Sequence, residues 1–456
     1  MNSTPQSTTQ PEDRLDLKKI FPVFFIILID LLGLTIIIPL MSLYAASFGA
    51  SASTIGLLGA AYPAAQFFGA PFLGRLSDKF GRKPILILSQ VGTLAGFLVL
   101  GMAGSMWMLF LARIIDGLSG ANISTAQAVI SDSTTAKTRT QGLGLVGAAF
   151  GLGFVVGPVI GALSLAVSHN NYHVPAFVAA GFSLASILLT TFLLTETLPA
   201  DQDKNTLKKR GFSFQALWDA MNKPLVGILL AFMFMQQVVF GGFQQLLSLF
   251  TLNRLGLNGS GNSILFVFVG IVIVAVQGYF IGKWSRKFGE VWLIRFGLAM
   301  LAVGLLLTAL TPRQPAPWYN QQAVLQELSG GRNLAGETPP TSSLQVAVPP
   351  DSNKGFLGLG WIMLSMIPIA IGGGVLQPSI NSLLTRRASP AEIGGTLGIS
   401  AALLSGANSV APVMGGAIFQ MLGSSAPFLF GAAVAAILFF MAIKNLKENP
   451  SPQTAE

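Results

Sequence analysis

Twelve long apolar runs constrain the fold of this chain more than any other feature. They begin near residues 20, 54, 85, 106, 141, 173, 224, 262, 291, 356, 392 and 426, and each continues for about twenty residues. A helix of about 20 apolar residues crosses a hydrocarbon layer about 30 Å thick, with its backbone hydrogen bonds satisfied internally. Barrel strands would instead alternate apolar and polar residues over about ten positions. We therefore predict an all-α integral membrane protein with twelve transmembrane helices.

The composition excludes several other classes of protein. Charged residues make up 10% of the chain and hydrophobic residues 52%, whereas soluble domains carry about 25% charged residues. The absence of cysteine excludes disulfides, thiolate metal sites and cysteine nucleophiles. The two histidines, His169 and His173, fall in a predicted outer loop. Because no HExxH pattern or phosphate-binding glycine loop occurs, we predict no enzyme, no catalytic or metal site, no cofactor and no use of ATP.

The basic residues lie in short segments between the apolar runs, and they predict the orientation. One side of the membrane would hold Lys18, Lys19, Arg75, Lys79, Arg82, Lys83, Lys137, Arg139, Lys204, Lys208, Lys209, Arg210, Lys223, Lys283, Arg286, Lys287, Arg386, Arg387, Lys444 and Lys447. The other side would hold only Arg254, Arg313, Arg332 and Lys354. The positive-inside rule places both termini in the cytoplasm of a multi-pass inner or plasma membrane protein. Anionic lipid headgroups, rather than nucleic acid, are the expected partner for the net charge of +9.

Two short sequences recur, which predicts an internal repeat. "GRLSDKFGRK" at 74 returns as "GKWSRKFGEV" at 282, and "GFVVGPVIGAL" at 153 returns as "NSVAPVMGGAI" at 408, with Pro158 aligned to Pro412. The offset grows between the two pairs, and the polar segment 312–355 supplies nearly that length. We therefore expect two six-helix bundles, with the solute path between them, as in transporters built from parallel repeats.

These patterns predict the organisation of the whole chain. The segments are a disordered cytoplasmic tail (1–19), an N-terminal six-helix bundle (20–196), a cytoplasmic linker (197–223), a C-terminal six-helix bundle (224–445) with the outer-loop insertion 312–355, and a second tail (446–456). The first tail lacks the basic start and apolar middle of a signal peptide. In the insertion, "PAPWYNQQAVLQEL" predicts a short helix over the outer vestibule, and "KNTLKKRGFSFQALWDAM" in the linker predicts a surface helix.

Four motifs resemble those of one transporter family. "GRLSDKFGRKP" (74–84) is similar to the loop motif between helices 2 and 3 of the major facilitator superfamily. "DLLGLTIIIP" (30–39), "RIIDGLSGA" (113–121) and "GLGFVVGPVIGA" (151–162) resemble motifs of its twelve-helix drug/proton antiporter branch, and tetracycline/proton antiporters are the nearest likeness within it. The third motif departs from the usual Arg-x-x-Gln-Gly pattern, because Asp116 stands where the branch has Gln.

The resemblance implies roles for two groups of residues. The cytoplasmic loop motif would be a conformational latch, formed by Gly74, Asp78, Gly81, Arg82 and Lys83, in which Asp78 meets the positive end of a helix from the other half. The alternative is a basic anchor at the membrane surface. The exporter motif of the fifth helix comprises Gly151, Gly157, Pro158 and Gly161. Its small residues suit close helix packing in any case, and the resemblance adds control of the gates.

Three charged residues stand well within the apolar runs: Asp30, Arg113 and Asp116. At 1.5 Å per residue, Asp30 lies about 15 Å, Arg113 about 19 Å and Asp116 about 15 Å from the cytoplasmic edge. Burial disfavours a charged carboxylate and a neighbouring cation favours it, so this cluster predicts a proton-coupling site. In the alternative, Arg113 and Asp116 neutralise each other on one helix, which leaves Asp30 as a lone acid facing water.

Uncharged polar residues in the runs are candidates for a substrate cavity. They are Tyr62, Gln66, Asn122, Gln237, Gln244, Gln377, Asn381 and Asn408. Each residue has the alternative role of a hydrogen bond between helices. Together with 33 Phe and 14 Met, they favour a cavity for a small amphipathic solute.

We therefore predict a monomeric secondary transporter that exports an amphipathic drug-like compound or metabolite in exchange for protons. The same fold leaves open an importer or uniporter of a nutrient or lipid-like solute. A membrane enzyme or a sensor is a third class, and the missing catalytic motifs argue against the enzyme.

Overall fold

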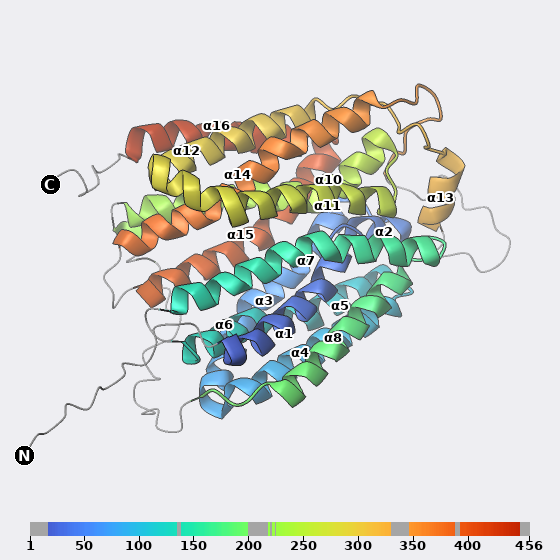
Figure 1. Ribbon diagram of the computed structural model, residues 1–456. Coiled ribbons are helices and arrows are strands. Elements are labelled where there is room, and N and C mark those ends of the chain that lie inside the picture. The colour runs from blue at the N-terminus through green and yellow to red at the C-terminus, as the bar shows by residue number, and fades with distance from the viewer. Residues whose placement is uncertain are drawn as a thin grey trace, which may run out of the picture.

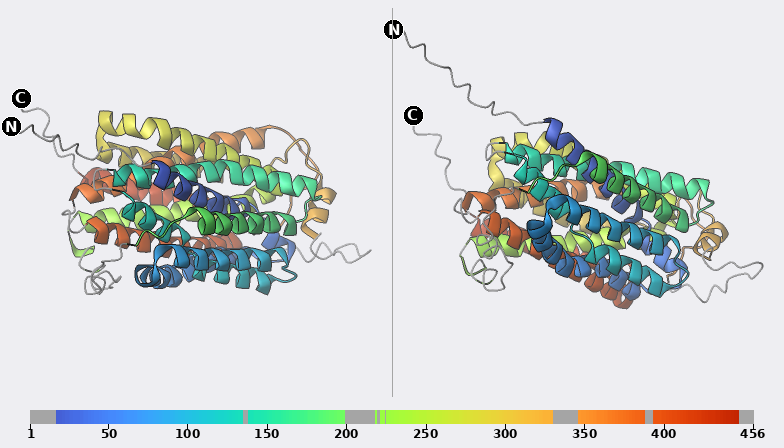
Figure 2. Two further views of the ribbon diagram at one scale, coloured as in Figure 1. Left: turned by 60° about the horizontal axis from the view of Figure 1, so that its bottom comes forward. Right: turned by 90° about the horizontal axis from the view of Figure 1, so that it is seen from below.

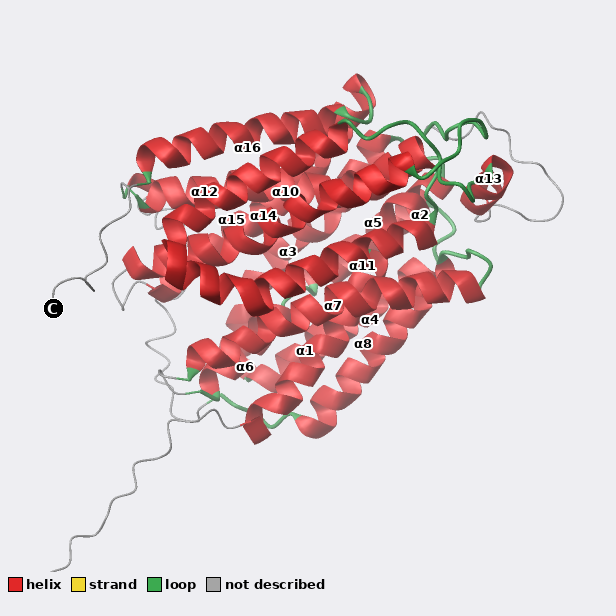
Figure 3. Ribbon diagram, turned by 45° about the horizontal axis from the view of Figure 1, so that its top comes forward, coloured by secondary structure: helices red, strands yellow, loops and turns green. Residues whose placement is uncertain are grey.

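The computed structural model describes residues 17–134, 138–198, 218, 221–223, 225–329, 346–387 and 393–446. Helices make up nearly all of these ranges, and no strand occurs in them (Figure 3). The prediction of an all-α fold is therefore confirmed. The first tail and most of the linker, with its expected surface helix, lie outside the described residues.

The helices follow the apolar runs. In the N-terminal half of the chain (17–198) they are α1 (Leu17–Ile37), α2 (Met41–Ser47), α3 (Ala52–Phe80), α4 (Arg82–Gly101), α5 (Met106–Leu118), α6 (Asn122–Asp132), α7 (Arg139–Val167) and α8 (His173–Leu193). In the C-terminal half (225–446) they are α10 (Val226–Leu255), α11 (Gly259–Ala275), the π-helical turn η2 (Val276–Phe280), α12 (Ile281–Ala309), α13 (Gln321–Ser329), α14 (Leu357–Arg387), α15 (Ile393–Leu422) and α16 (Ala426–Asn445). The short helix expected in the insertion is α13.

Nine stretches of the described residues are long and apolar enough to span a membrane. One of them, Gly259–Ala309, includes Gly289, whose φ of 78° lies in the left-handed region and interrupts the helix. The run from residue 106 is divided between α5 and α6, which have 13 and 11 residues. The count of twelve membrane spans therefore stays a prediction.

The break between α5 and α6 is stabilised by two neighbouring helices. Gln66 on α3 donates to the carbonyl of Gly120 at 2.8 Å, and Ser89 on α4 donates to the carbonyl of Ser119. The Ser89 hydroxyl also accepts from the backbone N–H of Ala121 at 3.2 Å. Side chains of two neighbouring helices thus satisfy backbone groups that a continuous helix would pair internally.

The two halves lie side by side and meet along two pairs of helices. Figure 1 shows α1, α4, α5 and α8 on one side and α10, α12, α14 and α16 on the other, and the pairs α3–α15 and α7–α11 join them. The short helices α2 and α13 also touch across the halves. Both views in Figure 2 keep α13 at the end of the bundle opposite to the start of α1 and the end of α16. We call these the α13 end and the termini end.

The contacts between the halves run from the α13 end, where Gly56 lies, to the middle of the helices, where Gly270 lies. A Cβ at Gly56 of α3 would lie 2.2 Å from the carbonyl oxygen of Pro412 on α15, and one at Gly270 of α11 would lie 2.8 Å from that of Phe154 on α7. Hydrogen bonds between described residues also cross between the halves, and they include Ser248 Oγ to Pro39 O (2.8 Å), Ser42 Oγ to Gln245 O (2.8 Å), Ala52 N to Gln420 Oε1 (3.1 Å) and Tyr172 Oη to Glu327 Oε1 (2.8 Å). The structure is therefore closed at the α13 end.

Candidate functional site

An acid and an amide from different helices meet inside the N-terminal half. Asp30 on α1 accepts a hydrogen bond from Asn122 Nδ2 on α6 at 2.9 Å, and this amide also lies 3.2 Å from Thr93 Oγ1 on α4. Asp30 Oδ1 and Asn122 Oδ1 are buried and have no hydrogen-bond partner among the described residues. Buried polar atoms are normally paired, so these two oxygens mark a place where a proton, a water molecule or a ligand group can bind.

The predicted ion pair forms within one helix. Arg113 Nη2 lies 3.4 Å from Asp116 Oδ2, and both side chains are buried. The guanidinium sits between two rings, 5.9 Å from the centroid of Tyr62 and 5.7 Å from that of Phe97. The structure thus has the pairing of the alternative interpretation, in which Arg113 and Asp116 balance each other. Asp30 then has an amide partner rather than a cation.

These groups border one small cavity. Its lining includes Asp30, Tyr62, Thr93, Asp116 and Asn122, contributed by five helices, and its volume is about 20 Å³. That volume is about what one water molecule requires. The structure therefore brings both predicted acids to the same cavity, which is too small for an amphipathic solute in this conformation.

Of the other cavity candidates in the N-terminal half, Gln66 makes a hydrogen bond between helices and Tyr62 bonds to Gln66 on its own helix. Gln66 Nε2 lies 3.1 Å from the hydroxyl of Tyr62, and it also donates to the carbonyl of Gly120 between α5 and α6. Tyr62 and Gln66 are four residues apart on α3, so they project from one face. Gln66 thereby holds Tyr62 beside the small cavity.

The candidates of the C-terminal half form a separate group. Gln237 Nε2 on α10 donates to Asn408 Oδ1 on α15 at 2.8 Å. Gln244 is half-buried and Gln377 is exposed. Asn381 Oδ1 is buried with no hydrogen-bond partner in the described part of the chain. These residues do not line the cavity of Asp30, and their role in binding stays a prediction.

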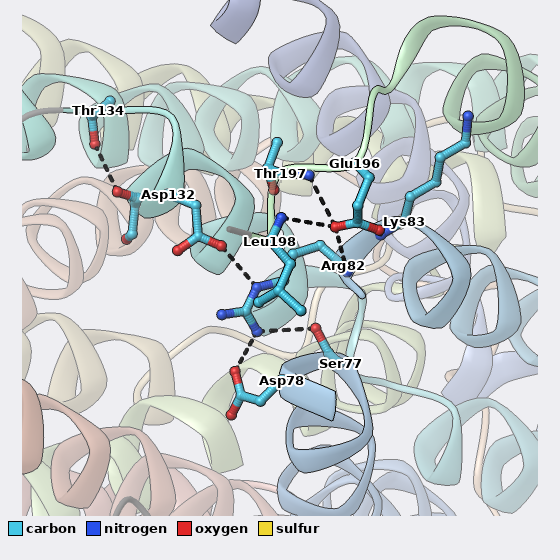
Figure 4. A network of polar contacts seen from close by, with 10 residues as sticks. Ser77, Asp78, Arg82, Lys83, Asp132, Thr134, Glu196, Thr197 and Leu198 are labelled. Carbon is cyan, nitrogen blue, oxygen red and sulfur yellow. Dashed lines mark hydrogen bonds and ion pairs between the residues drawn. The ribbon is translucent and has the colours of Figure 1, made fainter. Parts of the chain in front are cut away.

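The loop motif at residues 74–84 forms a network inside the N-terminal half (Figure 4). Arg82 donates to Asp78 at 2.5 Å, to Asp132 at the end of α6 at 2.9 Å, and to the hydroxyl of Ser77 at 3.1 Å. Gly81 allows the reversal between α3 and α4, because its φ is 106°, while a Cβ at Gly74 would meet nothing within 4 Å. Asp78 thus pairs with its own half here, and the latch to the other half stays a prediction.

Glu196 completes this network, and the sequence analysis did not identify it. Its carboxylate accepts from the backbone N–H groups of Arg82 at 2.9 Å and Lys83 at 3.1 Å, at the start of α4. Lys83 Nζ donates in turn to the carbonyl of Thr191 on α8 at 2.8 Å. An acid just past an apolar run gives no sign in sequence that it faces the positive end of another helix.

The stabilisation by Glu196 should depend on pH. Burial alone would raise the pKa of its carboxyl, but hydrogen bonds from four backbone N–H groups outweigh burial and lower the pKa below its usual 4.5. A lowered carboxyl pKa stabilises the fold above the unfolded value, and this contribution is lost as pH falls through the folded value. We expect Glu196→Gln to melt at a lower temperature than the parent at pH 7. This difference in melting temperature should disappear below pH 4.5. Thermal unfolding at a series of pH values measures it, and a gap independent of pH would contradict the role of ionisation.

The exporter motif of α7 packs closely on α1. A Cβ at Gly157 would lie 2.1 Å from Thr35 Oγ1, and one at Gly161 would lie 3.1 Å from the carbonyl of Ile36. Gly151 faces the other half, where a Cβ would lie 3.1 Å from Val274 Cγ2 on α11. Pro158 lies inside the helix between these contacts. Close packing is therefore present, while a role in gating stays a prediction.

Two charged residues of the C-terminal half make contacts that the sequence did not predict: Arg295, and Glu290, which the repeat aligns with Arg82. Arg295 lies inside α12 and donates to the carbonyl of Leu446, and Glu290 is buried beside Gly289 and accepts from Ser285 and Ser382. Both lie near the predicted start of the ninth apolar run, where a charge is indistinguishable from one at the membrane surface.

Comparison with known proteins agrees with the motifs. A sequence model of the Major Facilitator Superfamily matches residues 23–358, more than half of the chain. The chain is 26% identical to the Tetracycline resistance protein, class B, of Escherichia coli, over 87% of each protein. It is 28% identical to the class D protein of Salmonella ordonez, over 94% of this chain and 97% of that one. Multidrug resistance protein 1 of Bacillus subtilis (strain 168) is 26% identical, over 90% and 91%.

Solved structures share the fold at lower identity. The human organic anion transporter MFSD10 (TETRAN) superposes with a TM-score of 0.65 at 21% identity, over 95% of this chain and all of that one. The nucleoside transporter NupG gives 0.69 at 14% identity, again over 95% and all of that chain. The helices and motifs of the present chain, together with these relatives, show that it belongs to the Major Facilitator Superfamily. The chain is a multi-pass membrane transporter rather than an enzyme.

Proposed function

We propose that the protein exports a small amphipathic solute in exchange for protons by alternating access. The observation that carries this proposal is the cavity of Asp30 and Asp116, in which a buried carboxylate oxygen has no hydrogen-bond partner among the described residues. An ionisable residue at mid-membrane depth is costly unless it serves a pathway or a proton relay.

In this proposal Asp30 binds the proton. Asp116 has a counter-ion in Arg113 at 3.4 Å, whereas Asp30 has only the neutral amide of Asn122 at 2.9 Å. Protonating Asp30 therefore removes the uncompensated charge of the cluster and leaves the ion pair intact. Because hydration of the site changes as the halves rock, the proton affinity of Asp30 changes with conformation.

The contacts between the halves support rocking, and the names of the relatives support the kind of substrate. Apart from the bond between Tyr172 and Glu327, the halves touch through glycine contacts and neutral hydrogen bonds, and such contacts can separate without leaving a buried charge unpaired. The relatives named tetracycline and multidrug resistance proteins support an amphipathic substrate. We also expect the protein to act as a monomer in the cell membrane, with both termini in the cytoplasm and without ATP.

Transport in liposomes tests this function. Tetracycline serves as the probe because the relatives are named for resistance to it. We expect the protein to move tetracycline across the membrane when a pH gradient is imposed, in the direction opposite to the protons. We expect no stimulation by ATP. An importer or uniporter is the second candidate, and counterflow that proceeds equally with and without a pH gradient would favour it. If tetracycline gives no signal, a thermal-shift screen at two pH values identifies a solute for the same assay.

A further inference from the structure

A second, larger cavity lies at the α13 end, away from the Asp30 site. Its volume is about 510 Å³, and it is bordered by α2, by the loop 168–173 that precedes α8, and by α13. α2 and the loop belong to the N-terminal half, whereas α13 belongs to the insertion in the C-terminal half. The cavity therefore sits where the two halves meet, and Glu327 of α13 lies on its wall.

The Glu327 carboxylate bridges the two halves. Its Oε1 accepts from the hydroxyl of Tyr172 at 2.8 Å and from the backbone N–H of Gly259 at 3.2 Å. Its Oε2 accepts from Asn258 Nδ2 at 3.0 Å. Tyr172 lies in the N-terminal half, whereas Asn258 and Gly259 form the start of α11 in the C-terminal half. We call this set of three hydrogen bonds the Glu327 clasp.

On the C-terminal side the clasp is firmly anchored. The insertion is tied to α10 by hydrogen bonds from Ala316 N to Leu255 O at 3.1 Å and from Asn253 Nδ2 to Ala347 O at 2.9 Å. Tyr319 covers Gly256, where φ is 66° and a Cβ would lie 2.1 Å from the ring. Glu327 also sits at the positive end of α11. α13 should therefore move with the C-terminal half.

On the N-terminal side Tyr172 is held by packing. Its ring stacks on Tyr44 of α2, with centroids 5.6 Å apart and planes 12° apart. The Tyr44 hydroxyl lies 3.0 Å from His173 Nδ1 and 3.1 Å from the carbonyl of Leu100 at the end of α4. Tyr172 is thus part of the N-terminal half, and its hydroxyl reaches across to Glu327.

Separation of the halves would break one bond of the clasp and keep two. Burial raises the pKa of Glu327, and its three hydrogen bonds act in the opposite direction. When Tyr172 withdraws, Oε1 retains Gly259 and Oε2 retains Asn258, and the adjoining cavity gives the carboxylate access to water. The Glu327 carboxylate therefore keeps hydrogen-bond partners in both conformations. A buried carboxylate without partners would be destabilising.

We propose that the Glu327 clasp is an outer gate: Tyr172 and Glu327 position the halves against each other at the α13 end and stabilise the conformation closed there. The proposal goes beyond proton-coupled export, because it holds for any solute and any driving ion. A hydrogen bond to a charged acceptor changes an equilibrium by about tenfold or more. Losing it should therefore shift the balance toward the conformation open at the α13 end.

Spin-label distances test the gate without any substrate, so failure of the gate and failure of proton export are distinguishable. The chain has no cysteine, so label pairs can be introduced freely at exposed sites. Met102→Cys with Met421→Cys reports on the α13 end, and Phe80→Cys with Phe288→Cys reports on the termini end. In Tyr172→Phe we expect the population with a long distance at the α13 end to rise about tenfold relative to the closed one, with the termini end closing in return.

Tyr44→Phe is the matched control, because it removes a tyrosine hydroxyl from the same ring stack but breaks hydrogen bonds only within the N-terminal half. We expect its distances to equal those of the parent. Glu327→Gln is a second, independent variant and should shift in the same direction as Tyr172→Phe. Unchanged distances in Tyr172→Phe, or an equal shift in Tyr44→Phe, would overturn the proposal.

Discussion

Replacing Asp30 by Asn should abolish proton-driven transport while solute binding persists. The substitution preserves shape, and the new amide oxygen can still accept from Asn122, which lies 2.9 Å away in the parent. It removes the group that takes up and releases the proton, so we expect flux under a pH gradient to fall to the level of empty liposomes. Thermal-shift titration of the solute should still show binding, which separates loss of coupling from loss of the fold.

Two further variants sharpen this result. Asp351→Asn changes an exposed acid of the insertion whose partners are Lys354 at 3.1 Å and the backbone N–H of Gln321 at 3.1 Å. The new amide oxygen can still accept from Gln321, so this variant should transport like the parent. Asp116→Asn tests the other acid of the cavity as the proton site. Asp116 differs from Asp30 because it already has a cation, Arg113, beside it. Undiminished gradient-driven flux in Asp30→Asn, together with loss in Asp116→Asn, would move the proton site to Asp116.

Gly56→Val should force the α13 end open. A Cβ at this position would lie 2.2 Å from the backbone oxygen of Pro412 and 3.1 Å from Cα of Gly416, both in the other half. Overpacking of this kind costs about 1–3 kcal/mol, which corresponds to about 5–150-fold in an equilibrium. Because the overlap is with the other half, separation of α3 from α15 relieves it without unfolding either half. Transport should fall, since the protein can no longer close at this end.

The labelling rate of a single cysteine measures this opening. Ser42 is buried at the same interface, so Ser42→Cys should react slowly with a membrane-impermeant maleimide in the parent and faster in Gly56→Val. Gly181→Val is the matched control, because a Cβ there meets nothing within 4 Å among the described residues. Equal labelling rates in Gly56→Val and Gly181→Val would show that the contact does not control closure.

The helical fold could be predicted because apolar runs of this length have one stable form in lipid. The repeat, with Pro158 aligned to Pro412, predicts two halves, but it does not predict which helices pack across them. The gathering of Asp30 and Asp116 could also be predicted, since both lie about 15 Å from one edge. Which acid pairs with Arg113 stayed open between two alternatives, because depth alone does not determine which side chain turns toward it, and the structure has the pair within one helix, with Asp116.

Other features depend on contacts between distant segments. Nothing in the local sequence shows that Glu196 faces the start of α4 or that Glu327 faces the start of α11. The division of the fourth apolar run between α5 and α6 is stabilised by Gln66 and Ser89 on neighbouring helices. Hydrophobic periodicity reports the face that a helix buries, whereas these polar partners are set by the tertiary arrangement.

The Arg82 network has a mechanical consequence. It joins the last turn of α3 to the first turn of α4, with Asp132 tying in α6 and Glu196 and Lys83 tying in the end of α8. Four helix ends are thereby braced at one corner, so bending them individually would break several charge-assisted bonds at once. We therefore expect this corner to move as one rigid unit when the N-terminal half swings.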